Sequence, residues 1–328
     1  MLRDVKIGQY LSWSSVCQDG YSFSNTPVPG FDDGEVLARI NEFQPLISTD
    51  GSYQNEILKS VFNIGLRKAE VKPLWIVPKS IRRRRFMHVA RGGDVGTDAG
   101  MAPVDYTLHR QFAGLAKKGN DDKLKFANKY GLLSHQAVHN LIFRNPNTSR
   151  QFQIGESLVW WQEEINDMHS CVKLWDMIVS KDKKLKDVVL WHRDGIVIRL
   201  ENGDIHLVRR SNLNLLARWN KGDTKGPALY YLSVESNKRL TNKLTPRIPE
   251  FEKQEAYIYP DTLLSAIWLM FLLEMGGNIR LVKCHICGSY FSSHDPRAQY
   301  CSARCRMRKY RKSTMKKSRK RSRVNGLR

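Results

Sequence analysis

The chain has 328 residues, and 41% of them are hydrophobic, which is enough to build a sizeable core. These totals exclude a protein that is disordered throughout. Lys and Arg number 54 against 32 Asp and Glu, so the formal net charge is +22, and an excess of this size indicates a polyanionic partner. The segment from Arg306 to Arg328 holds twelve Lys or Arg and no acidic residue, which is more than half of the excess.

The first hundred residues mix short apolar runs with Gly and Pro, and we treat 1–100 as a mixed α/β region of unknown role. Residues 74–77 (LWIV) are flanked by prolines, a pattern that predicts a strand. Residues 91–100 hold four glycines and two aspartates, which is typical of a surface loop or linker.

Residues 101–279 are predicted to form a mainly helical body. Helical patterns begin near residue 105, and the clearest helix carries an apolar stripe with spacings of three and four: Leu158, Trp161, Ile165, Met168, Val172, Trp175 and Val179. We expect the acidic residues Glu163, Glu164 and Asp167 to lie on the polar side of this helix. The stripe is predicted to be core or a helix-partner surface.

Residues 188–209 change to a period of two, with Asp-Gly and Asn-Gly at the two turns. This pattern predicts a three-stranded antiparallel meander. Helices are predicted again at 212–220, 227–243 and 261–275, with a strand at 255–259. The fold class predicted for the chain is therefore α+β.

The apolar stretch at 263–273 is shorter than the roughly 20 residues that a membrane span requires. The first residues also lack the continuous apolar segment of a signal peptide. We therefore expect a cytoplasmic protein that does not enter a membrane.

Four of the six cysteines lie close together near the C-terminus, in the order C-x2-C-x13-C-x3-C: Cys284, Cys287, Cys301 and Cys305. Four thiolates at this spacing match the closed tetrahedral shell of a structural zinc ion. Free thiols or disulfides are the alternative, which is less typical of a chain without an export signal. We expect one Zn²⁺ with no open position for water or substrate.

The residues around the cysteines predict the shape of this zinc finger, which we place at 280–312. Gly288 follows the first pair and permits a tight knuckle, whereas Cys301 and Cys305 share one face if a helix begins there. A knuckle, a hairpin and a helix that supplies the last two ligands together make a treble clef.

A basic helix and tail follow the fourth cysteine. Arg304, Arg308, Arg311 and Lys312 fall on one third of the helix circumference, while Ala303, Met307 and Tyr310 form an apolar face that we expect to dock. Residues 313–328 are predicted to be a disordered basic tail. The candidate nucleic-acid-binding residues share a positive charge and this location: Arg304, Arg308, Lys309, Arg311, Lys312, Lys316, Lys317, Arg319, Lys320 and Arg321.

The stretch from CHICGSYF to QYCSARCRMRKYRK resembles the C-terminal finger of bacterial CGNR-type zinc-finger proteins. Members of that family are regarded as DNA-binding transcription regulators, so the resemblance implies a similar role. One departure is Arg306-Met307-Arg308, which stands where the family name records Gly-Asn-Arg. KFANKYGLLS, SLVWW and DTLLSAIWLMFL look like a broader group of bacterial proteins with the same finger.

Three hypotheses follow. In the first, the finger and basic helix bind nucleic acid, with DNA favoured over RNA, and the helical body senses a ligand or forms homo-oligomers. In the second, the finger contacts another protein in a stress response or in phage defence. In the third, the chain is an enzyme acting on nucleic acid through the first two thirds of the sequence, although no catalytic residue is identifiable there.

Overall fold

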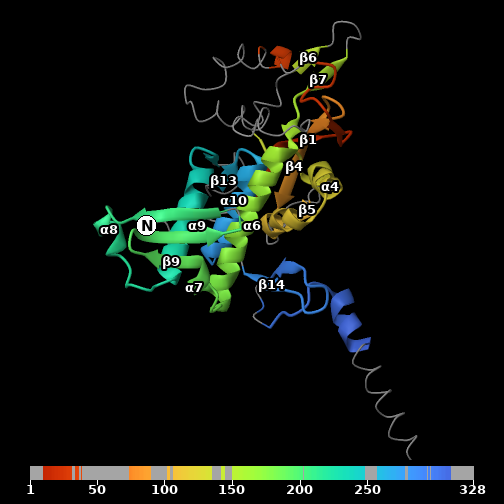
Figure 1. Cartoon of the computed structure of the whole chain (residues 1–328). Helices are drawn as coiled ribbons and strands as arrows, with labels where there is room; N and C mark the ends of the chain where they lie inside the picture. The colour runs from red at the N-terminus through yellow and green to blue at the C-terminus, as the bar shows by residue number, and fades with distance from the viewer. Residues whose placement is uncertain are drawn as a thin grey trace, which may run out of the picture.

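The computed structural model describes residues 10–31, 34–36, 38, 74–89, 102–103, 106–134, 142–144, 150–201, 203–247, 257–277, 280–293, 295 and 297–311. Within these residues the fold is α+β, as the sequence predicts, with a helical body and several small sheets (Figure 1). None of the described helices has the length and apolar character needed to cross a membrane.

The longest described helix, α6 (Leu158–Ser180), runs through the body and packs against α3, η1 and α9, while α10 contacts α3 and α9 as well as α6 (Figure 1). Its partners have these bounds: α3 (Leu108–Ala113), η1 (Gly114–Lys117), α4 (Asn120–Tyr130), α9 (Lys225–Leu240) and α10 (Leu263–Met275). The predicted stripe is buried from Leu158 to Val172, but Val179 is 61% exposed, whereas its neighbour Ile178 is buried in the core. The stripe is therefore core along most of its length.

The acidic residues of α6 lie on a side that α9 covers. Glu164 is buried and forms an ion pair with Arg239 of α9, whose guanidinium also lies 2.6 Å from Asp167. This side of α6 is therefore polar, as the sequence predicts, but it faces a cation of α9.

Helix α10 is buried on nearly every side, which agrees with its nearly continuous apolar sequence. Thr262 and Ser265 form a capping box at its start, with Thr262 Oγ1 accepting from Ser265 N at 2.8 Å. Glu274 in the last turn is the acidic exception. Its side chain is only 8% exposed.

The meander confirms the prediction for 188–209. Strands β9 (Val189–His192), β10 (Gly195–Leu200) and β11 (Gly203–Arg209) pair antiparallel in the order β11-β10-β9. Short helices flank it, α7 (Leu185–Val188) and α8 (Leu213–Leu216), the latter a single turn where 212–220 was predicted. Strands β12 (Leu244–Arg247) and β13 (Tyr257–Pro260) form a further antiparallel pair.

The described strands of the first hundred residues pack on the same core as the body. Strands β2 (Tyr21–Ser24) and β3 (Trp75–Pro78) pair with β8 (Glu156–Ser157), which leads directly into α6. Val16, Tyr21 and Ile76 belong to the main core cluster. The strand predicted at 74–77 is therefore present, shifted by one residue.

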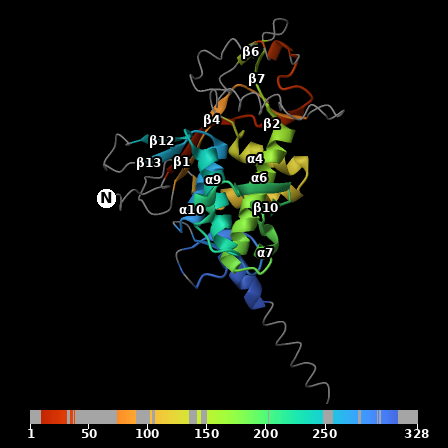
Figure 2. The ribbon, with the colours of Figure 1, turned by 60° about the vertical axis from the view of Figure 1, so that its left-hand side comes forward.

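Two further sheets complete the described part of this region. Strand β1 (Tyr10–Cys17) pairs antiparallel with β4 (Arg83–Val89), and β4 pairs in parallel with β5 (Ala102–Pro103). Strands β6 (Ile142–Arg144) and β7 (Gln151–Gln153) form a hairpin at one end of the molecule (Figures 1 and 2). The loop predicted at 91–100 lies outside the described residues.

Candidate metal centre and its junction with the body

The sulfur atoms of Cys284, Cys287, Cys301 and Cys305 all lie within 4.8 Å of one another. Sγ of Cys301 is 3.5 Å from Sγ of Cys287 and 3.6 Å from Sγ of Cys305. Four sulfurs at about 2.3 Å from one zinc ion stand roughly 3.8 Å apart at the corners of a tetrahedron, whereas a disulfide requires about 2.05 Å. The four predicted cysteines are therefore brought together at a spacing that fits a metal ion.

A short hairpin presents the first pair of cysteines. Strands β14 (Leu281–Lys283) and β15 (Tyr290–Ser292) pair antiparallel, and Cys284 N donates to Ser289 O at 2.9 Å across the knuckle. Gly288 closes the turn at φ +74°, a conformation that a residue with a Cβ adopts only at a cost. The glycine after the second cysteine therefore has the role that the sequence predicts.

A helix presents the second pair. Residues 303–311 are helical, and Ser302 caps the helix by accepting from Cys305 N at 3.3 Å. Cys301 and Cys305 thus stand on either side of the helix start. The backbone also ties the two halves together, because His285 N donates to Gln299 O at 3.1 Å.

The close packing of the cysteine cluster moves the pKa values of two of these thiols in opposite directions. Burial raises the pKa of Cys284, but amide donors from Cys287, Cys301 and Ile286 outweigh this effect and bring it to about 6. Desolvation within the cluster and the neighbouring sulfurs raise the pKa of Cys301 to about 12. Four adjacent thiolates repel one another, so this donor set suits a divalent ion that accepts sulfur ligands.

The helix at 303–311 carries a fully exposed row of cations. Arg304, Arg308 and Arg311 are separated by four and three residues and share one face, with Lys309 beside them. No ion pair joins these four side chains to an acidic residue of the described chain. Figures 1 and 2 show the helix projecting away from the body. The other predicted nucleic-acid-binding residues, Lys312, Lys316, Lys317, Arg319, Lys320 and Arg321, lie outside the described residues.

The apolar face of the same helix does not dock, contrary to the prediction. Met307 is 50% exposed and Tyr310 is 66% exposed. The finger meets the body through its hairpin instead of through the helix, so the helix extends away from the core and leaves this face in solvent.

The hairpin contacts the body through Leu281, which packs against the main core cluster, and through Tyr290. The Tyr290 ring lies under the guanidinium of Arg110 from α3, with 4.0 Å between the guanidinium carbon and the ring centroid. Its hydroxyl donates to Asp176 of α6 at 3.5 Å. Tyr290 therefore joins the finger to the body.

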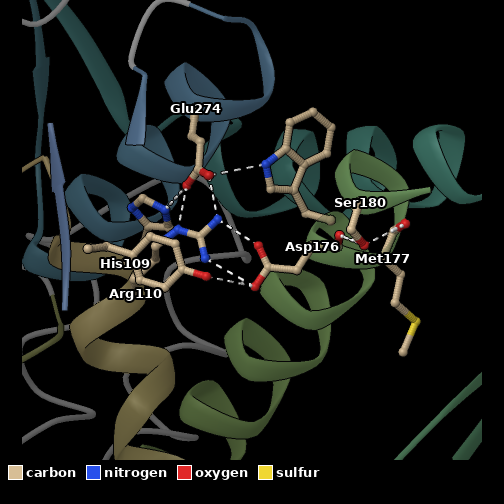
Figure 3. A network of polar contacts seen from close by, with 8 residues as sticks. His109, Arg110, Asp176, Met177, Ser180 and Glu274 are labelled. Carbon is tan, nitrogen blue, oxygen red and sulfur yellow. Dashed lines mark hydrogen bonds and ion pairs between the residues drawn. The ribbon is translucent and has the colours of Figure 1, made fainter. Parts of the chain in front are cut away.

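Arg110 is held by two carboxylates from two other helices (Figure 3). Nη2 donates to Asp176 at 2.8 Å, and Nε donates to Glu274 of α10 at 2.9 Å, with a second, shorter contact between Nη2 and Glu274. Trp175 Nε1 also donates to Glu274, at 3.2 Å. Three helices therefore converge on one arginine.

His109 completes this network from the buried side. Its Nε2 lies 2.5 Å from Glu274, while Nδ1 is buried without a partner among the described residues. Burial lowers the pKa of His109, so its ring is neutral and Nε2 donates. Burial raises the pKa of Glu274, but the donors of His109 and Arg110 outweigh this effect and lower it to about 2.

Sequence reasoning did not find this network. The one local signal is Glu274, a carboxylate at the end of a helix that is otherwise apolar, because a buried acid needs a cation or several donors. Its partners His109, Arg110 and Trp175 lie 165, 164 and 99 positions away in the chain. Only the packing of α3, α6 and α10 brings them together.

Comparison of the chain with protein-family models, with curated proteins and with solved structures finds no match.

Proposed function

We propose that the chain binds one zinc ion through Cys284, Cys287, Cys301 and Cys305, and that the finger is a treble clef. The order of knuckle, hairpin and helix supports this proposal, as does the sulfur spacing of 3.5 to 3.6 Å. Four cysteine ligands close the shell, so the zinc has a structural role. Clustered thiols of this kind suit a reducing compartment such as the cytoplasm.

The function that we propose for the finger is nucleic-acid binding, with duplex DNA as the partner. One observation carries it: the exposed arginine face of helix 303–311, which holds the fourth cysteine in its first turn and projects from the body. Arginines without carboxylate partners on a rigid helix present their donors to phosphate oxygens without first breaking an ion pair. The resemblance to CGNR-type fingers favours DNA and a role in transcription regulation.

A salt series on labelled duplex DNA tests the proposal. If about six cations of the helix and tail neutralise phosphates, log affinity falls against log salt with a slope of roughly five. Replacing Arg304, Arg308 and Arg311 together by Gln is expected to lower that slope by about three. Replacing the exposed body arginines Arg193, Arg209 and Arg210 by Gln is the matched control and leaves the slope unchanged.

Two results contradict the proposal. One is the absence of salt-dependent binding to duplex DNA by the wild-type protein. The other is an equal loss of slope in both triple variants, because that would place the DNA on the body.

One observation favours a second candidate function, contact with a protein partner. Met307 and Tyr310 lie on a face next to that of the arginines and are half or more exposed. Apolar side chains of this size on one helix face are typical of partner surfaces. Replacement of Met307 and Tyr310 by Ser separates the two functions. If the helix binds DNA alone, this variant keeps the wild-type affinity for DNA.

A further inference from the structure

A cavity of about 650 Å³ lies between the body and the finger. One wall comes from α3, η1 and α4, and the other from the knuckle residues Gly288, Ser289 and Tyr290. Pockets that hold cofactors and small ligands have volumes of about 300 to 1,000 Å³. The cavity is therefore large enough for a small molecule, and it is distinct from the cysteine cluster and from the arginine face.

The lining of the cavity is strongly basic. Lys118, Lys125 and Lys129 line it, against one acidic residue, Asp122, which lies 3.5 Å from Lys125. Arg110 lines it as well, but its guanidinium is held by Glu274 and Asp176. The lysines therefore leave an excess positive charge that an anionic ligand would neutralise.

A row of hydrogen bonds fixes the polar groups of the body wall. Lys129 Nζ donates to Tyr130 at 2.7 Å, and the Tyr130 hydroxyl donates to Gln111 at 2.9 Å. Gln111 Nε2 in turn donates to Thr107 at 2.9 Å. Side chains held in this way are oriented before a ligand arrives, which reduces the entropy lost on binding.

One partly exposed aromatic ring, that of Tyr290, lies beside these charges. Phe126 and Tyr130 also line the cavity, but their side chains are buried in the core, with 4.7 Å between their tilted rings. An inorganic anion would use only the lysines and would leave most of the volume and the ring of Tyr290 without a contact. The lining is matched better by a ligand that carries both an anionic group and a ring.

We propose that this cavity binds a phosphorylated small molecule of nucleotide size. The phosphate lies among Lys118, Lys125 and Lys129, and the rest of the molecule extends toward Tyr290. Because the finger supplies one wall and the body the other, the ligand contacts both and strengthens their association. This site goes beyond the proposed function, because it takes a free small molecule and needs no nucleic acid.

Isothermal titration of the full chain tests the proposal with six probes. Four are the nucleoside monophosphates AMP, GMP, CMP and UMP, the fifth is ribose 5-phosphate, and the sixth is adenosine, which lacks phosphate. We expect at least one phosphorylated probe to bind with a Kd below about 1 mM, and adenosine to bind at least roughly tenfold more weakly than AMP. Equal binding of ribose 5-phosphate and the nucleotides would support the site and show that the base is not recognised.

A pair of double variants locates the binding. Lys118→Ala with Lys125→Ala is expected to raise the Kd roughly tenfold or more. Lys117→Ala with Lys186→Ala is the matched control, because these two lysines are exposed but do not line the cavity. All four side chains lie at the surface, so neither variant is expected to change the melting temperature by more than about 2 °C.

The proposal is overturned if no phosphorylated probe binds at concentrations up to about 5 mM, or if adenosine binds as tightly as AMP. An equal rise in Kd in the two double variants would also overturn it. These results are independent of DNA binding, which is measured on the arginine triple variant, so failure of one proposal leaves the other standing.

Discussion

Arg110 lies over the ring of Tyr290, with 4.0 Å between its guanidinium carbon and the ring centroid, and this pair joins the finger to the body. The arginine is not free to move with the finger, since Glu274 and Asp176 hold it from α10 and α6. The finger therefore rests on a cation that the body has already positioned. The first three predictions below concern this junction.

Tyr290→Ala is expected to loosen the finger while leaving its metal site intact. A partly desolvated cation–π contact contributes about 1 to 2 kcal/mol, so amide exchange in β14 and β15 becomes roughly tenfold faster or more. Hydrogen exchange with mass spectrometry measures this change. Tyr290→Phe keeps the ring and loses only the 3.5 Å contact with Asp176, so it is expected to stay close to wild type. Equal acceleration in both variants would show that the hydroxyl, not the ring, makes the junction.

Glu274→Gln is expected to destabilise the body by about 3 kcal/mol, because Arg110 loses one of its two charged partners in a largely buried site. Urea unfolding followed by tryptophan fluorescence measures the effect. All eight tryptophans precede residue 280, so the signal reports on the body and not on the finger.

The control for this variant is Asp204→Asn, which breaks the exposed pair between Asp204 and Arg199 in the meander. A pair in solvent contributes less than about 1 kcal/mol. If Glu274→Gln lowered the free energy of unfolding by no more than Asp204→Asn, the buried network would not stabilise the body.

Stability of the body is expected to fall in acid. The pKa of Glu274 is about 2 in the fold against an ordinary value of 4.5, so the unfolded chain takes up the proton first. The resulting stabilisation, about 3 kcal/mol, is complete above pH 4.5 and is lost as the pH falls toward 2. Urea midpoints measured across this range in wild type and in Glu274→Gln test it. Parallel curves for the two proteins would contradict the assignment, because the variant lacks the titrating group.

Cys301→Ala with Cys305→Ala is expected to release the zinc ion and to unfold residues 280–311 locally. Two of four ligands are then missing, and a small finger has little core of its own to replace them. Elemental analysis measures the metal, and the tryptophan signal of the body is expected to be unchanged. Cys17 lies outside the cluster, so the Cys17→Ala variant is the control and is expected to retain one zinc per chain. Retention of one zinc by the double variant would show that these cysteines are not ligands.

Local patterns were sufficient to predict a good part of this protein. Three features follow from the periodicity of the backbone: the apolar stripe of α6, the alternation in β9, β10 and β11, and the apolar run of α10. A short window of sequence is therefore enough to predict these elements. The cluster of four cysteines could also be predicted locally, because a knuckle sets the spacing of the first pair and one helical turn sets that of the second. Zinc as the bound ion and DNA as the partner stay predictions.

The tertiary structure decided which charges are buried and which apolar residues are exposed. Glu274 meets Arg110, and Glu164 meets Arg239, because separate helices pack side by side, and no local pattern encodes such a meeting. The same holds for Met307 and Tyr310, which a helical wheel assigns to a docking face but which remain in solvent because the hairpin makes the contact. The sequence by itself determined most elements of the body and the four clustered cysteines, since both depend on neighbours in the chain. The junction and the basic cavity depend on neighbours in space, and only the packing of α3, α4 and α6 against the finger decided them.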